Sequence, residues 1–211
     1  MFVGITPERV AAMTAKEKRW LDNARKAFHD SDMLYQAERP EDGSIQLLCI
    51  GVELATKLHK SLAGEGVSTD QSRRNFVGFV DMEIPRPEDG GLAIGIAVRD
   101  DATGEFVPMS FARLLYEVRC AYAHEYDNLD AAEYPGHRLT IDWSGSLGPF
   151  FGRMVGEERF VINGQQLWQR LRELLAKFLT GIAGYECFAA RQSFSITVNP
   201  ALGAIRNAKR S

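Results

Sequence analysis

Cysteine is scarce in this chain, and its few cysteines suit neither a disulfide framework nor a metal site. Cys49, Cys120 and Cys187 are odd in number and far apart, with no Cys-x-x-Cys pair. Disulfide-stapled domains use even numbers of cysteines, and zinc sites use closely spaced ones. We therefore expect free thiols and a reducing, cytoplasmic location.

Long apolar runs and an excess of charge of one sign are also missing. No uninterrupted apolar segment approaches the roughly 18 residues that a membrane helix needs, and the N-terminal segment MFVGITPERVAAMTAKEKRW becomes charged too early for a signal peptide. The formal net charge is −3. This charge excludes binding to nucleic acid by bulk charge alone, although it leaves room for a local basic site. No membrane partner is expected.

Familiar metal and cofactor motifs are absent or incomplete. His124 and Glu125 begin the zinc-protease pattern His-Glu-x-x-His, but Asn128 stands where the second histidine is required. The glycines around Gly91 and Gly95 lack the Lys-Ser/Thr of a phosphate-binding loop. The other three histidines have no second ligand at a suitable spacing. The sequence therefore predicts no metal site and no cofactor.

The pattern that the chain does contain is the apolar periodicity of helices. With 211 residues, of which 45% are hydrophobic, the chain is long enough to bury a substantial core. Thr14 with Glu17 forms a capping-box pattern, and Asn163 is a candidate N-cap. The predicted helices cover residues 14–38, 44–63, 69–82, 111–128 and 164–191.

Gly51 interrupts the second of these helices. Glycine costs about 1 kcal/mol of helix propensity relative to alanine. A structural reason for its presence would be the close approach of another helix, and the helix that contains Arg119 is one candidate.

The remaining segments predict a small β component. Arg138–Trp143 and Glu158–Ile162 alternate as strands do and are separated by glycines, which predicts a β-hairpin over residues 138–162. Residues 84–108 hold three prolines and a DGG turn, which predicts a loop excursion with a short strand or hairpin. Residues 195–211 are expected to form a tail.

Phe111–Asn128, FARLLYEVRCAYAHEYDN, combines a buried helical stripe with two groups suited to chemistry. Arg119 is a permanent cation, and His124 titrates near neutrality. Five helical steps leave them about 140° apart around the axis, so they do not share a narrow stripe. Arg119 must curl toward the end of the helix, or the helix must unwind nearby, for the two groups to meet.

The stretch LYEVRCAYAHE resembles the signature of the HEPN family, in which an arginine is followed after four to six residues by a histidine near the end of a bundle helix. The resemblance covers about Lys16–Tyr126, and the last long helix would complete the bundle. It implies a mainly α fold: a HEPN-like helical bundle of about five helices, with a small β-hairpin inserted between the motif helix and the last long helix. The whole chain, 1–211, would be a single domain with its core at about 14–191.

The family further implies a homodimer and, in active members, metal-independent RNA cleavage at a composite site built from both copies of the motif. Arg119 and His124 would be the catalytic residues. Cleavage beside a 2′-hydroxyl needs a base for its proton and an acid for the leaving oxygen, and histidine serves as either. A guanidinium binds the phosphate oxygens on which negative charge accumulates.

Four further residues are candidates for binding RNA. Lys57, Arg73 and Arg74 could line its approach, although such charges are more often a solvated helix face. Tyr126 could stack on a base or lie at the rim.

Three residues near the motif have supporting roles to weigh. Glu117 either orients the His124 imidazole or pairs with Arg113 at the i, i+4 spacing. Either Asp127 or Glu125 is a candidate partner for Arg119 at the helix end. Cys120 stands where the family commonly has a polar residue, and a thiol bonds only weakly.

Two functions therefore remain open. One is an endoribonuclease of a toxin or defence system, restrained by an antitoxin or other defence partner protein. The other is a catalytically inactive HEPN-like module that binds nucleotide, RNA or a protein, and Cys120 favours this second function.

Overall fold

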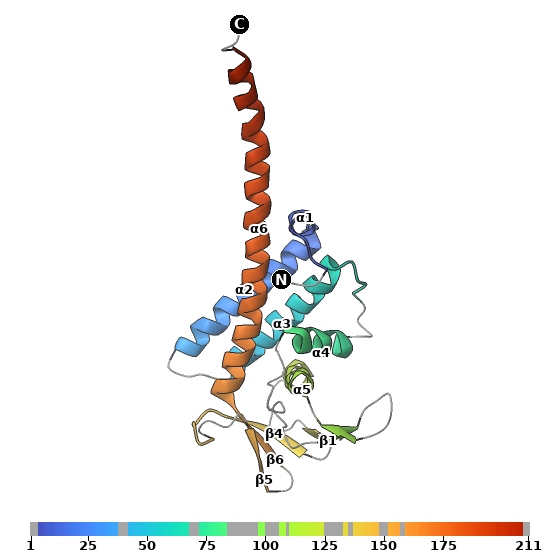
Figure 1. Cartoon of the computed structure of the whole chain (residues 1–211). Coiled ribbons are helices and arrows are strands. Elements are labelled where there is room, and N and C mark those ends of the chain that lie inside the picture. The colour runs from blue at the N-terminus through green and yellow to red at the C-terminus, as the bar shows by residue number, and fades with distance from the viewer. Residues whose placement is uncertain are drawn as a thin grey trace.

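The chain folds as the mainly α protein with a small β insert that the sequence predicts (Figure 1). The computed structural model describes residues 4–37, 42–67, 72–83, 97–99, 106–108, 110–124, 133–134, 137–147, 152–156 and 159–208. Its helices are α1 (Pro7–Ala11), α2 (Ala15–Gln36), α3 (Asp42–Leu62), α4 (Ser72–Glu83), α5 (Phe111–His124) and α6 (Gly164–Ala208). Its strands are β1 (Ala97–Arg99), β2 (Phe106–Pro108), β3 (Glu133–Tyr134), β4 (His137–Asp142), β5 (Gly152–Val155) and β6 (Arg159–Asn163).

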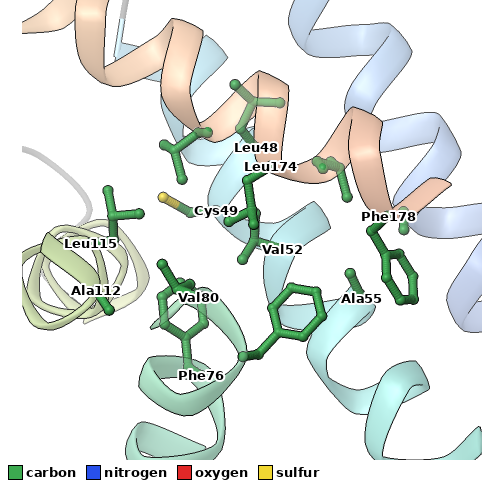
Figure 2. Close-up of a cluster of buried hydrophobic side chains, with 14 of the residues drawn as sticks. Leu48, Cys49, Val52, Ala55, Phe76, Val80, Ala112, Leu115, Leu174 and Phe178 are labelled. Carbon is green, nitrogen blue, oxygen red and sulfur yellow. The ribbon is translucent and has the colours of Figure 1, made fainter. Parts of the chain in front are cut away.

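Helix α3 lies at the centre of the core, where α4, α5 and α6 meet it (Figure 2). Leu48 and Val52 of α3 are fully buried, as are Leu115 of α5 and Phe178 of α6. Phe79 of α4 meets Phe178 edge-on at 5.5 Å between ring centroids. Because each helix contributes one apolar stripe to this cluster, the periodicity of the sequence is sufficient to explain the bundle.

The predicted capping box at the start of α2 is present, and it ties three helices together. The Glu17 side chain is only 2% exposed and accepts hydrogen bonds from the backbone N of Thr14 at 2.7 Å and from the Ser61 hydroxyl of α3 at 2.7 Å. The Arg9 guanidinium at the end of α1 donates to both carboxylate oxygens of Glu17. One buried carboxylate therefore joins α1, α2 and α3.

Gly51 does mark a close helix approach, but the neighbours are α6 and α2 rather than the helix that contains Arg119. A Cβ at Gly51 would lie 2.5 Å from Leu175 Cδ2 and 3.5 Å from the Ala27 Cβ. Leu175 is fully buried, so its methyl group has little room to move.

Replacing Gly51 with alanine is expected to lower the free energy of unfolding by about 1 kcal/mol, because overpacking costs roughly 1–3 kcal/mol and outweighs a gain of about 1 kcal/mol in helix propensity. Gly78 in α4 is the matched control, because a Cβ there meets nothing within 4 Å. Gly78→Ala should therefore stabilise the protein. Urea denaturation measures both changes, and equal stabilisation by the two substitutions would contradict the close approach.

The two predicted strands over 138–162 are paired, but the prediction that they form a hairpin with each other is wrong. Strands β4 and β6 run parallel, with Arg138 opposite Arg159 and Asp142 opposite Asn163. The intervening strand β5 pairs antiparallel with β6, giving the order β3-β4-β6-β5. The chain reverses its direction between β4 and β5 and again between β5 and β6. Strands β4 and β6 therefore run in the same direction. Within the predicted excursion 84–108, β1 and β2 form a short antiparallel pair.

Helix α6 begins directly at the end of β6 and is longer than the sequence predicts. Asn163 caps it as expected, since its Oδ1 accepts a hydrogen bond from the Gln166 backbone N at 3.2 Å. The helix continues to Ala208 instead of ending near Arg191, so residues predicted as a tail are helical, and α6 extends well beyond the other helices (Figure 1). None of the described helices has a stretch long and apolar enough to span a membrane.

Candidate functional site

Helix α5 positions the Arg/His motif against the centre of the bundle. The Ser110 hydroxyl accepts a hydrogen bond from the Arg113 backbone N at 3.1 Å, which caps the helix. Leu114, Leu115 and Val118 are fully buried and fix the rotation of α5. This rotation places Arg119, the next residue, at the edge of the core.

The C-terminal part of the motif is described only as far as the backbone of His124. His124 is the last residue of α5. Its side chain, Glu125, Tyr126 and Asp127 lie outside the described residues. The composite site that needs these residues is therefore a prediction that the described residues do not test.

Arg119 is held by a carboxylate that sequence reasoning did not include. Its Nε and Nη2 donate to the same oxygen of Glu53 on α3, at 2.9 Å and 2.5 Å. The side chains of Arg119 and Glu53 are 19% and 23% exposed, so this ion pair is partly shielded from water. Burial alone would lower the pKa of Arg119, but the hydrogen bonds and charge of Glu53 outweigh burial and raise it.

Glu53 accepts from a second cation through its other oxygen. Lys57 Nζ lies 2.7 Å from Glu53 Oε1, one helical turn away. Burial would raise the pKa of Glu53, but hydrogen bonds from Lys57 and Arg119 lower it below its usual value. Glu53 therefore stays ionised at neutral pH and is shared by two positive groups. The i, i+4 spacing of Glu53 and Lys57 was visible in the sequence, but their proximity to Arg119 was not.

Within the described part of the chain, one nitrogen of the Arg119 guanidinium has only a weak acceptor. Nη1 lies 3.8 Å from the sulfur of Cys120, the residue predicted to weaken the site. The Tyr116 ring is 5.9 Å from Arg119 Cζ, and the Tyr116 hydroxyl lies 3.3 Å from the Ser72 hydroxyl of α4. Burial is the largest cause that raises the pKa of Tyr116. An anionic oxygen that binds Arg119 at Nη1 would therefore displace the weakest of its contacts.

Glu117 pairs with Arg113 rather than standing alone beside the motif. Arg113 Nε donates to Glu117 Oε1 at 2.6 Å, the i, i+4 ion pair that was one of two predicted roles. This contact occupies one carboxylate oxygen of Glu117.

Arg119 lines a cavity of about 200 Å³ between α3 and α4. Lys57, Lys60, Ser72 and Asn75 also line it. A second cavity, of about 470 Å³, shares Lys60 and Asn75 with the first and includes Arg74. Of the predicted RNA-binding cations, Lys57 and Arg74 therefore lie along this pair of cavities. Arg73 is half-buried and lines neither cavity.

Two residues that line these cavities were not predicted from the sequence as part of the site. Ser72 and Asn75 of α4 line the cavity beside Arg119, and no motif pointed to them. Among the described residues, no three His, Cys, Asp or Glu side chains are grouped closely enough to hold a metal ion.

Comparisons with protein-family models, with curated proteins and with solved structures gave no match to this chain. Its function must therefore be inferred from the residues themselves.

Proposed function

We propose that the chain is a HEPN-type, metal-independent endoribonuclease that acts as a homodimer through Arg119 and His124. The observation that carries the proposal is the way in which the Arg119 side chain is held. Two of its nitrogens are fixed by Glu53, while among the described residues Nη1 has only the Cys120 sulfur beside it, and the side chain lines a cavity between α3 and α4. A guanidinium held in this way is preorganised for a phosphate oxygen.

The reaction divides between the two motif residues. One His124 of the dimer takes the proton of the RNA 2′-hydroxyl, whose oxygen then forms a bond to the adjacent phosphorus. The bond from phosphorus to the 5′-oxygen breaks, and the His124 of the other copy protonates that leaving oxygen. Arg119 binds the non-bridging oxygens while their negative charge increases. The products are a 2′,3′-cyclic phosphate and a free 5′-hydroxyl.

A catalytically inactive module that binds nucleotide, RNA or a protein is the second candidate. The contact that favours it is the same ion pair, because Glu53 offsets the charge with which Arg119 would meet a phosphate. Cys120 also supplies only a weak hydrogen-bonding group beside the guanidinium. In this case the chain would bind RNA and leave it intact.

The cellular setting belongs to the same proposal. The three thiols are free, and burial raises the pKa of Cys49 to about 12, which keeps this thiol protonated and unreactive. Free thiols support a cytoplasmic location. An RNA-cleaving toxin or defence protein there would need an antitoxin or other partner to restrain it.

The test is cleavage of a single-stranded RNA by the purified protein, with and without a chelator, over a range of protein concentrations. We expect the chelator to have no effect, and the rate per protomer to fall on dilution as the dimer dissociates. Light scattering at the same concentrations measures the dimer. Activity that disappears with the chelator, or a rate per protomer that stays constant while dimers dissociate, would contradict the proposal. Tight RNA binding without cleavage would favour the inactive module.

A further inference from the structure

Asn75 is a buried polar residue whose side-chain oxygen has no structural role among the described residues. It lies on α4 and is 7% exposed, and its side-chain oxygen Oδ1 has no hydrogen-bond donor among the described residues. A buried acceptor without a donor loses its hydrogen bond to water on folding and gains none in return, which destabilises the folded protein. Such a group in a folded protein calls for an explanation, and a ligand that supplies the missing donor is one.

Asn75 lines both of the cavities between α3 and α4. The larger, of about 470 Å³, also has Phe79 of α4 and His59 of α3 in its wall. The rings of Phe79 and His59 lie 5.5 Å apart and are tilted by 60°. An amide beside two aromatic rings offers hydrogen bonding and an apolar surface in one place.

Cations lie at the same cavity. Lys60 lines it and is 2.9 Å from the Glu65 carboxylate, and the exposed Arg74 has no ion-pair partner within the described part of the chain. Lys60 also lines the smaller cavity, so a positive group stands where the two cavities meet. A ligand with a flat ring and a neighbouring phosphate matches this arrangement.

We propose that the larger cavity is a subsite for one unpaired base of the RNA strand, and that Asn75 reads the edge of that base. Asn75 Oδ1 lacks a donor, and adenine presents an amino donor beside a ring-nitrogen acceptor, which an asparagine amide pairs with in bidentate fashion. Unpaired bases are commonly held by aromatic side chains in this way. The inference rests on the proposed function only for the cleavage step, not for binding.

The subsite would set the position of cleavage. Because the two cavities share Asn75 and Lys60, a strand with its base at Asn75 passes Lys60 and continues toward Arg119. The phosphate next to the bound adenine would then be the one that Arg119 meets. Asn75 is thus a specificity-determining residue, and Arg119 acts on the phosphate.

The experiment measures binding without cleavage. Fluorescently labelled five-nucleotide strands of 2′-O-methyl adenosine, cytidine and uridine carry no free 2′-hydroxyl, so the wild-type protein can be titrated with each by anisotropy. We expect the adenosine strand to bind about 5- to 100-fold more tightly than the uridine strand, the range for one bidentate base contact. Asn75→Ala should remove this preference by weakening the adenosine strand more than the uridine strand.

Two variants guard against a trivial loss of structure. Asn75→Asp keeps the side-chain shape but replaces the amide NH₂ with an oxygen, and should weaken binding of every strand by adding negative charge. Tyr185→Phe removes a buried hydroxyl that, like the Asn75 amide oxygen, has no partner among the described residues. This substitution should leave the preference intact. Melting temperatures close to that of the wild type confirm that each variant is folded.

The outcomes separate this inference from the proposed function. Equal affinities for adenosine and uridine strands, or a preference that persists in Asn75→Ala, would overturn the base subsite even if the protein cleaves RNA. A preference for the cytidine strand would overturn the assignment to adenine. An adenosine preference that depends on Asn75, in a protein that cleaves no RNA, would establish the subsite and leave the ribonuclease proposal refuted.

Discussion

Replacing His124 with alanine is expected to lower the rate of RNA cleavage by about 10²–10⁴-fold, the usual contribution of a general acid or base. The effect should fall on the rate at saturating RNA rather than on RNA affinity, because the imidazole moves protons and does not hold the strand. In a homodimer each substitution removes both copies, so the acid and the base are lost together. Single-turnover cleavage of a labelled RNA measures the rate.

His29→Ala is the matched control, because the His29 side chain is 73% exposed on α2 and lies outside the motif helix. It should cleave at the wild-type rate. The wild-type rate should also rise and fall across neutral pH as one histidine must be neutral and the other charged. Cleavage by the His124 variant at the wild-type rate would contradict the assignment of His124 as the general acid and base.

Replacing Glu17 with glutamine is expected to lower the free energy of unfolding at neutral pH by about 2 kcal/mol. Burial by itself would raise the pKa of Glu17, but hydrogen bonds from Arg9, Ser61 and Thr14 together lower it from 4.5 to about 2. A shift of this size corresponds to roughly 3 kcal/mol. Arg9 is 33% exposed, so solvent screens part of its attraction and we take the smaller figure.

The same pKa fixes how stability depends on pH. The pKa of Glu17 is lower in the folded protein than in the unfolded chain, so its contribution is fully present above pH 4.5 and is lost as the pH falls toward 2. The wild-type protein should therefore lose stability more steeply than Glu17→Gln over this interval. Urea denaturation at several pH values measures the difference between the two proteins.

Glu65→Gln provides the comparison for Glu17. Glu65 also pairs with a cation, Lys60, but its side chain is 57% exposed, and exposed ion pairs contribute little. The Glu65 variant should follow the wild-type curve closely. If both variants lost the same free energy of unfolding, the buried junction between α1, α2 and α3 would contribute no more to stability than an exposed ion pair does.

The helices could be predicted from the sequence because their signals are local. Thr14 with Glu17 fixed the start of α2, and Asn163 fixed the start of α6, because capping needs only residues three positions apart. The end of α6 was harder to predict, and the predicted helix stopped near Arg191, well before Ala208. Helix ends fray, and apolar periodicity alone does not locate them.

The sheet and the site could be predicted only in part because they depend on contacts distant in sequence. The alternation in 138–143 and 158–162 identified two paired strands, but it does not encode their direction, which the unrecognised strand β5 decided. Arg119 was identified from its motif, whereas its partner Glu53 lies 66 positions earlier on another helix. No periodicity in either helix specifies that pair.

The junction between β6 and α6 has a mechanical consequence. Strand β6, one of the two inner strands of its sheet, continues into α6 without a loop. The Trp143 ring packs so closely on Gly164 that a Cβ there would lie 2.6 Å from it, so strand, helix and indole are in tight contact at one point. This junction leaves the sheet little room to hinge against the bundle at that point. A force applied to the strands travels along α6 into the helical core, and the two parts should melt cooperatively.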